Sequence, residues 1–363
     1  MANAQPRIAL RIGDTDWLGW LHANVMMTMD AVSGSFTVGL TDRWPGSGSS
    51  RPISPFMPCR LLLDDEPLIT GYIDRVSPNG SHDDHTVTIT GRDKTSDLVD
   101  CAAVTGEWRG LKLDAIIAEL AKPVGISVKA EVDVGVPFER FRTQEGEQAW
   151  PAIDRACKAR AVVAMADGNG NVLLTRAKMS SGSPAPLILG GKDGNVLSFS
   201  GDFSGEERFS VYTIKAQQGG LAGTPEDRAH VIAEARDDGV PRYRPMTIIA
   251  RDRMDAAAAR RQAQWECNVR RGQALRATYT LAGWRTAAGK IWRPNTIVRV
   301  RDDWQWMAID RDLIVVSVRL EVSGDGMLAT LDLTDPSAYL PEPPPQEKKK
   351  GGKGKPKVED VGL

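Results

Sequence analysis

Apolar and polar residues alternate with a period of two in segment after segment of this chain. Ile8, Leu10 and Ile12 share one face of the first such segment, and later Val87 and Ile89 alternate with threonines. A period of two places every second side chain on the same side of an extended strand. The pattern therefore predicts a chain built mainly of half-buried β-strands, and few other folds tolerate it.

The apolar period changes to that of an α-helix in two spans after Cys101. Pro123 with Gly125 is expected to end the first helix, and Pro151 fits the second only within its first turn. Two strands then flank the Asp-Gly-Asn-Gly turn that begins at Asp167. The apolar residues at helical spacing are Leu113, Ile116, Ile117 and Leu120 in the first helix, and Trp150, Ile153 and Cys157 in the second.

Strand alternation returns in the second half of the chain. It is interrupted by an alanine- and arginine-rich stretch, predicted to be a helix over about 252–271 that ends at Gly272. A long strand and its hairpin partner follow near residues 313–334. The residues expected to share a face are Tyr212, Ile214 and Ala216; Ala258, Trp265 and Val269; and Ile314, Val316, Val318, Leu320 and Val322.

A length of 363 residues favours two or three compact units over one. The predicted fold class is a β-rich α+β protein with two antiparallel β-barrel domains and an intervening α+β lobe. The Pro-, Lys- and Gly-rich end has almost no apolar residue to bury, so it is expected to be a disordered tail. The predicted parts are 1–100 for the first β-barrel, 101–182 for the lobe, 183–340 for the second β-barrel with its inserted helix, and 341–363 for the tail.

Charge and cysteine content exclude several classes of protein. The 46 basic and 47 acidic residues leave a net charge of −1, which provides no overall field to attract nucleic acid or an anionic membrane. Four widely spaced cysteines support neither a zinc knuckle nor a disulfide framework, so reduced, mostly buried thiols are expected. No secretion signal or membrane span is visible, and a protein made in the cytoplasm is expected.

Two polar clusters are candidate sites, each with a structural alternative. His82, Asp83, Asp84 and His85 could hold a divalent metal ion, but they follow a turn between two strands, and a solvated hairpin tip is the favoured interpretation. The second cluster suits either acid/base catalysis of glycosidase type or a capped turn with local ion pairs, and the turn is favoured. Its members are Asp93, Asp97 and Asp100, with Arg92 and Lys94.

The remaining motifs are weak. Residues 167–171 resemble the start of a calcium loop without its later glutamate, and residues 191–195 lack the Lys-Ser/Thr of a phosphate loop. The helix with Trp150 shows a faint resemblance to the glycan-binding LysM module. No hydrolase elbow, zinc-protease helix or dinucleotide fingerprint occurs, so no catalytic, cofactor-binding or metal residue is predicted, and no enzyme is expected. The lysines of the tail, which could tether or touch phosphates, are Lys348, Lys349, Lys350, Lys353, Lys355 and Lys357.

Several segments, in their order along the chain, resemble the baseplate hub family of Mu-like phage tails. This family, called the P protein family, is related to contractile-tail hub and secretion spike-hub proteins. The resemblance extends to about residue 340. The segments that carry it begin GYIDRVSPNG at Gly71, GEQAWPAIDR at Gly146, VLSFSGDFSG at Val196, VPRYRPMTII at Val240, RRQAQWECNV at Arg260 and LIVVSVRLEV at Leu313.

The resemblance implies a structural virion protein of a contractile tail. Three copies, each with two tail-tube-like barrels, would form a pseudo-sixfold ring that joins the sixfold tail tube to the trimeric central spike. Implied partners are the tail tube, spike, baseplate wedge and tape-measure proteins, with DNA crossing the lumen without sequence-specific contacts and no insertion into a membrane. Ring contacts are expected near Gly91-Arg92 and Gly283-Trp284, in a baseplate assembled in the host cytoplasm.

An alternative from another functional class remains open at this point. A tail component that binds or hydrolyses peptidoglycan would use the LysM-like helix and the carboxylates from Asp93 to Asp100. No cofactor is expected for either function.

Overall fold

The computed structural model describes residues 6–41, 53–81, 85–180, 185–217, 230–250, 254–324 and 326–343. The chain divides into two compact units, one of residues 1–207 with 269–341, and one of residues 208–268 with 342–363. The predicted tail lies outside the described residues from residue 344 onward. No helix among the described residues is long and apolar enough to cross a membrane.

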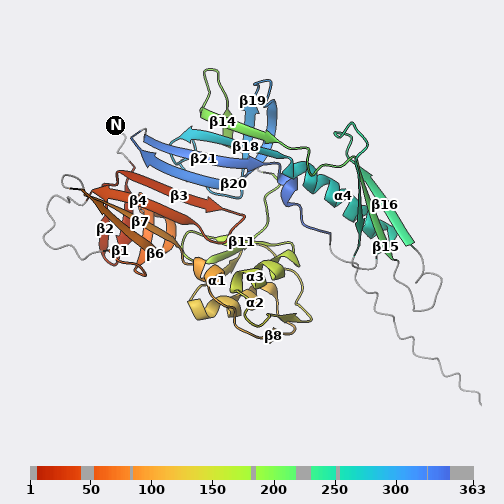
Figure 1. The fold of residues 1–363 in the computed structure, drawn as a ribbon, viewed down its shortest axis with the longest axis horizontal. Coiled ribbons are helices and arrows are strands. Elements are labelled where there is room, and N and C mark those ends of the chain that lie inside the picture. The colour runs from red at the N-terminus through yellow and green to blue at the C-terminus, as the bar shows by residue number, and fades with distance from the viewer. Residues whose placement is uncertain are drawn as a thin grey trace, which may run out of the picture. The chain divides into compact units, whose positions relative to one another are not determined.

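A 13-stranded sheet dominates the larger unit (Figure 1). It combines strands from the two ends of the chain, and its main path runs β14-β18-β21-β20-β3-β4-β7-β6-β5-β1-β2, with β13 and β19 attached through β20. The N-terminal strands are β1 (Ile8–Ile12), β2 (Thr15–Trp17), β3 (His22–Thr28), β4 (Ser35–Thr41), β5 (Pro58–Leu63), β6 (Glu66–Gly80) and β7 (His85–Asp93). The C-terminal strands are β13 (Ala185–Ile188), β14 (Val196–Phe203), β18 (Leu275–Ala282), β19 (Thr296–Asp302), β20 (Ile309–Ser323) and β21 (Gly326–Thr334), followed by the 3₁₀ helix η3 (Pro336–Tyr339).

The predicted class, a β-rich α+β protein, is confirmed, but the two β parts are joined rather than closed separately. Antiparallel pairing of β20 with β3 makes them one sheet, and among the described strands β2 and β14 each pair with a single neighbour, so no closed barrel forms. The two β parts are joined because β20 is long. Its 15 residues let it pair with β19 at its start and with β3 further along.

A β-bulge in β20 corrects the predicted alternation of that strand. The register shifts between Val315 and Ser317. A strict alternation continued across this bulge would therefore assign the residues after it to the wrong face of the sheet. Val315 and Val318 therefore both face the main core of the sheet, whereas Ile314 belongs to a smaller apolar cluster with Ile297. The single face expected from Ile314 to Val322 does not exist.

Local sequence explains the other strand connections. In the hairpin between β5 and β6, Asp64 and Asp65 both have positive φ, of 50° and 67°, which matches a two-residue type I′ turn. Leu10 of β1 is fully buried, and Ile8 and Ile12 pack against the same core, as their spacing predicts.

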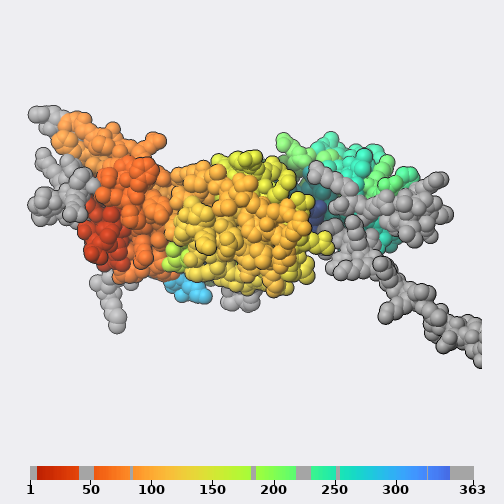
Figure 2. Space-filling view, turned by 90° about the horizontal axis from the view of Figure 1, so that it is seen from below, coloured from red at the N-terminus to blue at the C-terminus, as the bar shows by residue number. Residues whose placement is uncertain are grey.

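The α+β lobe, orange to yellow in Figure 2, follows β7. It has its own apolar core. Leu113, Ile116 and Ile117 of the first predicted helix are fully buried in it, and Gly125, at a φ of 65°, ends the turn that follows. Pro151 lies in the first turn of α3, where its missing N–H costs little. The elements are α1 (Ser96–Asp100), β8 (Glu107–Trp108), α2 (Leu113–Ala121), η1 (Lys122–Val124), β9 (Val128–Ala130), β10 (Phe141–Arg142), α3 (Ala149–Lys158), β11 (Val163–Ala166) and β12 (Val172–Thr175).

The smaller unit contains a three-stranded sheet and most of helix α4 (Ala256–Gln273), whose end from Val269 belongs to the larger unit. Tyr212 and Ile214 of β15 (Val211–Gln217) are buried, as their alternation predicts; β16 (His230–Arg236) and β17 (Pro245–Ile249) pair with this strand. The buried stripe of α4 in this core is Ala259, Ala263 and Cys267. Of the predicted stripe, Ala258 and Val269 are also buried, whereas Trp265 is only partly buried.

Gly272 does not end α4, as was expected, but lies inside it. A Cβ at this position would collide with the backbone of Ala338 in η3. The glycine is thus explained by the close packing of η3 against the end of the helix.

Candidate interaction surfaces

The carboxylates considered as an acid/base set lie where β7 passes into α1. Asp93 is 1% exposed, and its Oδ1 accepts hydrogen bonds from the backbone N–H and the hydroxyl of Thr95 at 3.0 and 2.9 Å. Burial raises the pKa of Asp93 to about 6, although the hydrogen bonds from Thr95 oppose the change. The Thr95 hydroxyl also donates to the carbonyl of Val32 at 2.8 Å. Asp93 therefore shapes the turn that leaves the sheet.

The charged neighbours of Asp93 hold the same junction together. Arg92 donates to Asp74 at 2.6 Å and to Asp100 at 2.7 Å, and the Lys94 ammonium donates to the carbonyl of Gly125 at 2.5 Å. Burial also raises the pKa of Asp97. Because two of the three carboxylates have local partners, the geometry favours the structural interpretation of this cluster over the acid/base one.

The calcium-like stretch is a hairpin turn between β11 and β12. Oδ1 of Asp167 accepts from the backbone N–H groups of Asn169 and Asn171 at 2.7 and 3.1 Å, and its Oδ2 accepts from Lys129 at 2.7 Å. Burial raises the pKa of Asp167, but the hydrogen bonds from Lys129 and Asn171 outweigh it and lower the pKa overall. Both carboxylate oxygens of Asp167, which a bound cation would need as ligands, therefore already accept hydrogen bonds from the backbone and from Lys129.

The phosphate-loop-like stretch, residues 191–195, lies between β13 and β14. Its Asn195 side chain accepts from the backbone N–H of Ile188 and donates to the carbonyl of Pro186, both at 2.9 Å. These bonds fasten the connection to β13, as in an ordinary turn.

The proposed metal cluster is only partly visible. His85 begins β7, whereas His82, Asp83 and Asp84 lie outside the described residues. Among the residues that are described, no group of three or more His, Cys, Asp or Glu side chains is arranged to hold a metal ion.

The LysM-like helix is α3. Trp150 is partly buried and packs against the core of the lobe. Arg155 binds Glu147 just before the helix at 2.7 Å and lies 5.1 Å from the ring centroid of Phe141. These contacts give Trp150 and Arg155 roles in packing the lobe.

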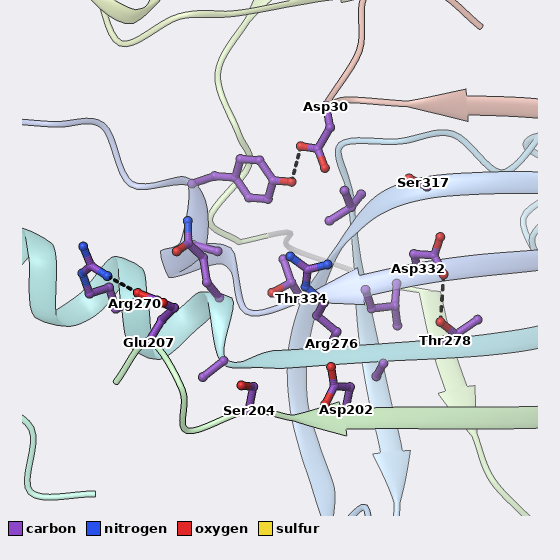
Figure 3. Close-up of a pocket in the computed structure, with 17 residues that line it drawn as sticks. Asp30, Asp202, Ser204, Glu207, Arg270, Arg276, Thr278, Ser317, Asp332 and Thr334 are labelled. Atoms are coloured by element: carbon purple, nitrogen blue, oxygen red, sulfur yellow. Dashed lines mark hydrogen bonds and ion pairs between the residues drawn. The ribbon is translucent and has the colours of Figure 1, made fainter. Parts of the chain in front are cut away.

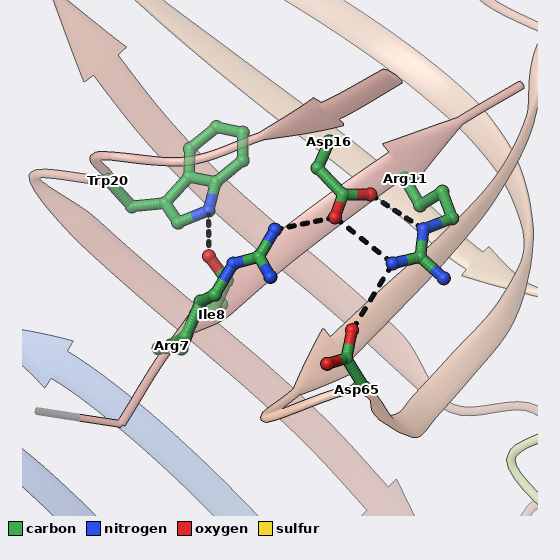
Figure 4. A network of polar contacts seen from close by, with 6 residues as sticks. All are labelled: Arg7, Ile8, Arg11, Asp16, Trp20 and Asp65. Carbon is green, nitrogen blue, oxygen red and sulfur yellow. Dashed lines mark hydrogen bonds and ion pairs between the residues drawn. The ribbon is translucent and has the colours of Figure 1, made fainter. Parts of the chain in front are cut away.

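A network of charges covers β1 and β2 at one end of the sheet (Figure 4). Arg11 donates to Asp16 at 2.6 Å and to Asp65 at 3.3 Å, and Arg7 reaches Asp16 from the other side at 2.6 Å. The hydrogen bond from Arg11 lowers the pKa of Asp16. Beside the network, the indole N–H of Trp20 donates to the carbonyl of Ile8 at 3.1 Å. The ion pairs of this network hold β1, β2 and the turn between β5 and β6 together, which is a structural role.

A cleft with a volume of about 800 Å³ lies over β18, β20 and β21 (Figure 3). Tyr339 donates to Asp30 at 2.6 Å, and Thr278 donates to Asp332 at 2.8 Å. The residues that line the cleft include no histidine, cysteine or lysine, so they offer no familiar nucleophile and base pair.

At the end of the sheet opposite β2, apolar side chains gather on strand β14 and on the loop between β19 and β20. The Phe199 ring contacts Trp304 edge to face, with ring centroids 5.3 Å apart, and Met307 is buried below. We call the exposed part of this group the edge patch; it consists of Leu197 at 60%, Phe203 at 51%, Trp304 at 48% and Trp306 at 71% exposure.

These observations define a class: a β-rich structural protein whose two β parts share one sheet. Family models match along most of the chain. Residues 7–93 match the N-terminal domain of the Mu phage baseplate assembly protein GpP-like family, residues 95–176 the second domain of the baseplate hub protein gp44-like family, and residues 255–342 the fourth domain of the Mu phage GpP family.

The curated and solved relatives agree with this match. The chain is 30% identical to the baseplate hub protein gp44 of Escherichia phage Mu over 95% of its length and 92% of that protein. The 43 kDa tail protein of prophage MuSo2 from Shewanella oneidensis has 33% identity and a TM-score of 0.79, covering 93% of this chain and all of that one. A tail protein from Neisseria meningitidis MC58, at 21% identity, has the same fold, with a TM-score of 0.76 over 93% and 99% of the two chains.

The chain therefore belongs to the baseplate hub family of Mu-like phage tails, as its ordered segments predicted. As a baseplate hub protein, it is a component of the virion tail.

Both segments expected to make ring contacts also make contacts within the chain, and the ring contacts themselves stay a prediction. Trp284 is 2% exposed and donates to the carbonyl of Glu321 at 3.0 Å, while Arg92 binds Asp74 and Asp100. The edge patch and the cleft are surface features that sequence reasoning missed. The sequence shows the alternation of β14, but it does not show that Leu197 and Phe203 of this strand are exposed.

Proposed function

We propose that three copies of this chain form a ring that adapts the sixfold tail tube to the trimeric central spike. The observation that carries the proposal is the joined sheet. Each chain contributes an N-terminal β part, β1 to β7, and a C-terminal β part built from β13, β14 and β18 to β21. Two such parts in each of three chains provide six positions toward the tube and three toward the spike.

The domain organisation follows from the same proposal. Residues 1–100 and 183–340 act as the two tube-like parts, and residues 101–182 form a lobe at their junction. The family matches to 7–93, 95–176 and 255–342 support this division. The separate compact unit of residues 208–268 is then an insertion into the second part.

The proposed ring encloses a channel for DNA and the tape-measure protein. A net charge of −1 supports passage, because a lumen rich in Lys and Arg would bind phosphates and retain the DNA. The chain performs no catalysis in this proposal. Tube, spike and wedge proteins of the baseplate are its partners, and the tail is contractile.

Electron microscopy of the purified protein tests the proposal. We expect negative-stain class averages to show a threefold ring with a central hole, and sedimentation velocity to give the mass of three chains. Compact monomers at the highest concentration reached would refute the ring. A zymogram on peptidoglycan tests the absence of catalysis, and clearing of the gel that disappears in Asp97→Asn would overturn it.

A further inference from the structure

The three-stranded sheet of the smaller unit has one covered face and one exposed face. Helix α4 packs against the face that carries Tyr212 and Ile214 (Figure 1). Side chains alternate between the two faces of a strand, so the residues between these lie on the opposite side, which we call the outer face. The residues of β16 and β17 on the outer face are all exposed: His230, Ile232, Glu234, Arg236, Pro245, Thr247 and Ile249.

An apolar row crosses the outer face. Lys215 of β15 lies opposite Ile232 on β16 and opposite Ile249 on β17. The two isoleucines are 61% and 79% exposed. Side chains opposite each other on neighbouring strands have Cβ atoms about 5 Å apart, and the aliphatic stem of a lysine packs along apolar neighbours. Together the three side chains form one exposed apolar strip, which is a feature typical of an interface.

The charges beside this strip lack partners in the described part of the chain. Neither Lys215 nor Arg236 makes a side-chain hydrogen bond or ion pair with another residue there. The outer face carries a single carboxylate, Glu234, which accepts from the hydroxyl of Thr213 at 3.4 Å. Basic side chains thus outnumber acidic ones on this face. An occupant that complements it combines aliphatic side chains with carboxylates.

The chain itself contains a segment of this composition after its described residues. Residues 344–357 consist of Pro, Lys, Gly, Gln and Glu, without an aliphatic or aromatic side chain. Residues 358–363, which we call the end segment, read Val-Glu-Asp-Val-Gly-Leu. The end segment therefore holds three aliphatic side chains and two carboxylates, preceded by a stretch with the composition of a flexible linker.

The linker is long enough to bring the end segment to the outer face. Gln262 of α4 donates to Glu342 at 3.1 Å, so the chain leaves the described structure beside the helix of the same unit. A flexible linker of 14 residues spans about 20 Å, more than the roughly 10–12 Å diameter of a helix. Tethering through a short flexible linker gives an effective concentration on the order of 1 mM, so even a weak contact is populated.

We infer that the end segment, residues 358–363, binds the outer face of the smaller unit in the same chain. Its aliphatic side chains cover Ile232 and Ile249, and its two carboxylates pair with Lys215 and Arg236. The contact shields an interaction face in the free chain. It does not depend on the proposed ring, and the ranges matched by the family models include neither the three strands nor the end segment.

Carbodiimide cross-linking of the full chain tests the inference, because it couples carboxylates to lysines that they contact. Mass spectrometry should identify a product that joins Lys215 to Glu359 or Asp360. Ile249→Ser should lower the yield of this product at least fivefold, since it removes apolar area without changing a reacting group. Val136→Ser, at a position of the lobe that is 69% exposed, is the matched control and should leave the yield unchanged. Circular dichroism melting curves verify that both variants are folded.

A second variant changes the occupant instead of the sheet. Val361→Ser/Leu363→Ser lies outside the packed cores and should cause the same fivefold fall. An equal yield in this variant, in Ile249→Ser and in wild type would show tethering alone and overturn the inference, as would the absence of a Lys215 product.

Isotope labelling tests whether the contact lies within one chain. Chains labelled with heavy nitrogen and unlabelled chains are unfolded in urea, mixed and refolded before cross-linking. We expect each Lys215 product to carry a single isotope. Products that combine both isotopes would assign the outer face to the end segment of another copy and contradict the contact within the chain. None of these results bears on the ring, which is tested by the mass of the assembly.

Discussion

Asp93 is the buried carboxylate whose ionisation should be visible in the stability of the protein. Its pKa is raised from 3.8 to about 6 by burial, so the folded protein holds the proton more tightly than the unfolded chain. The contribution of Asp93 to stability is then fully present below pH 4 and is lost as the pH rises through 6. Two pKa units correspond to about 3 kcal/mol.

Asp93→Asn removes this ionisation while keeping the oxygen that accepts from Thr95. We expect the unfolding free energy of the variant, minus that of wild type, to increase between pH 4 and pH 7 by up to about 3 kcal/mol. Urea denaturation at several pH values measures it. Asp303→Asn, at an exposed position, is the control and should show no such trend. A difference independent of pH would contradict the assignment.

The cysteines provide a second prediction for individual residues. Cys59, Cys157 and Cys267 are buried, and burial raises the pKa of Cys59 and Cys157 to about 12, whereas Cys101 is exposed. A thiol reagent should therefore modify Cys101 rapidly in the native protein and all four cysteines in denaturant. Mass spectrometry of the labelled peptides identifies the site. Rapid native labelling of Cys157 would show that the core of the lobe opens.

Close packing of β6 against the end of β7 depends on Gly71. An added Cβ would collide with the carbonyl of Arg92 and lie 2.7 Å from backbone atoms of Asp93 and Lys94. Because backbone cannot move aside as a side chain can, Gly71→Ala should destabilise the protein by about 3 kcal/mol. Gly205→Ala, where an added Cβ has no neighbour within 4 Å, is the matched control. Equal midpoints of urea unfolding would contradict this account.

At the scale of elements, the sequence predicted the positions of strands and helices better than it predicted which of their faces are buried. The helical spacing of Leu113 and Ile116 predicted both α2 and its buried side, because a short helix packed on one core has one apolar face. In α4 the predicted Ala258 and Val269 are buried, but so are Ala259 and Ala263, which a search for large apolar side chains overlooks. In β20 the bulge after Val315 reverses the faces, and no residue type announces it.

The whole molecule consists of two compact units, and the smaller one should respond to its own substitutions. Ala263 is fully buried between α4 and the three-stranded sheet, so Ala263→Leu overpacks that core and should destabilise it by about 1–3 kcal/mol. Calorimetry should show one unfolding transition lowered and the other unchanged. Ala257→Leu, on the exposed side of the same helix, is the control. An equal shift of both transitions would show that the units unfold together.

As a hub, the molecule depends on surfaces more than on a single site. The charged network of Arg11 and Asp16 at one end of the sheet and the edge patch with Trp306 at the other are different solutions for an open edge. The first pairs its charges within the chain, while the second leaves apolar area uncovered.

The amino-acid sequence was sufficient for the β-rich class, the lobe, and the family through its ordered segments. It predicted strands because alternation is a local property, present within Ile8 to Ile12 without reference to the rest of the chain. Pairing is not local: β20 joins β3 across nearly the whole chain, and alternation states which side chains share a face but not which strand lies next to them. For the same reason the open edge of β14 became visible only when its neighbours were in place.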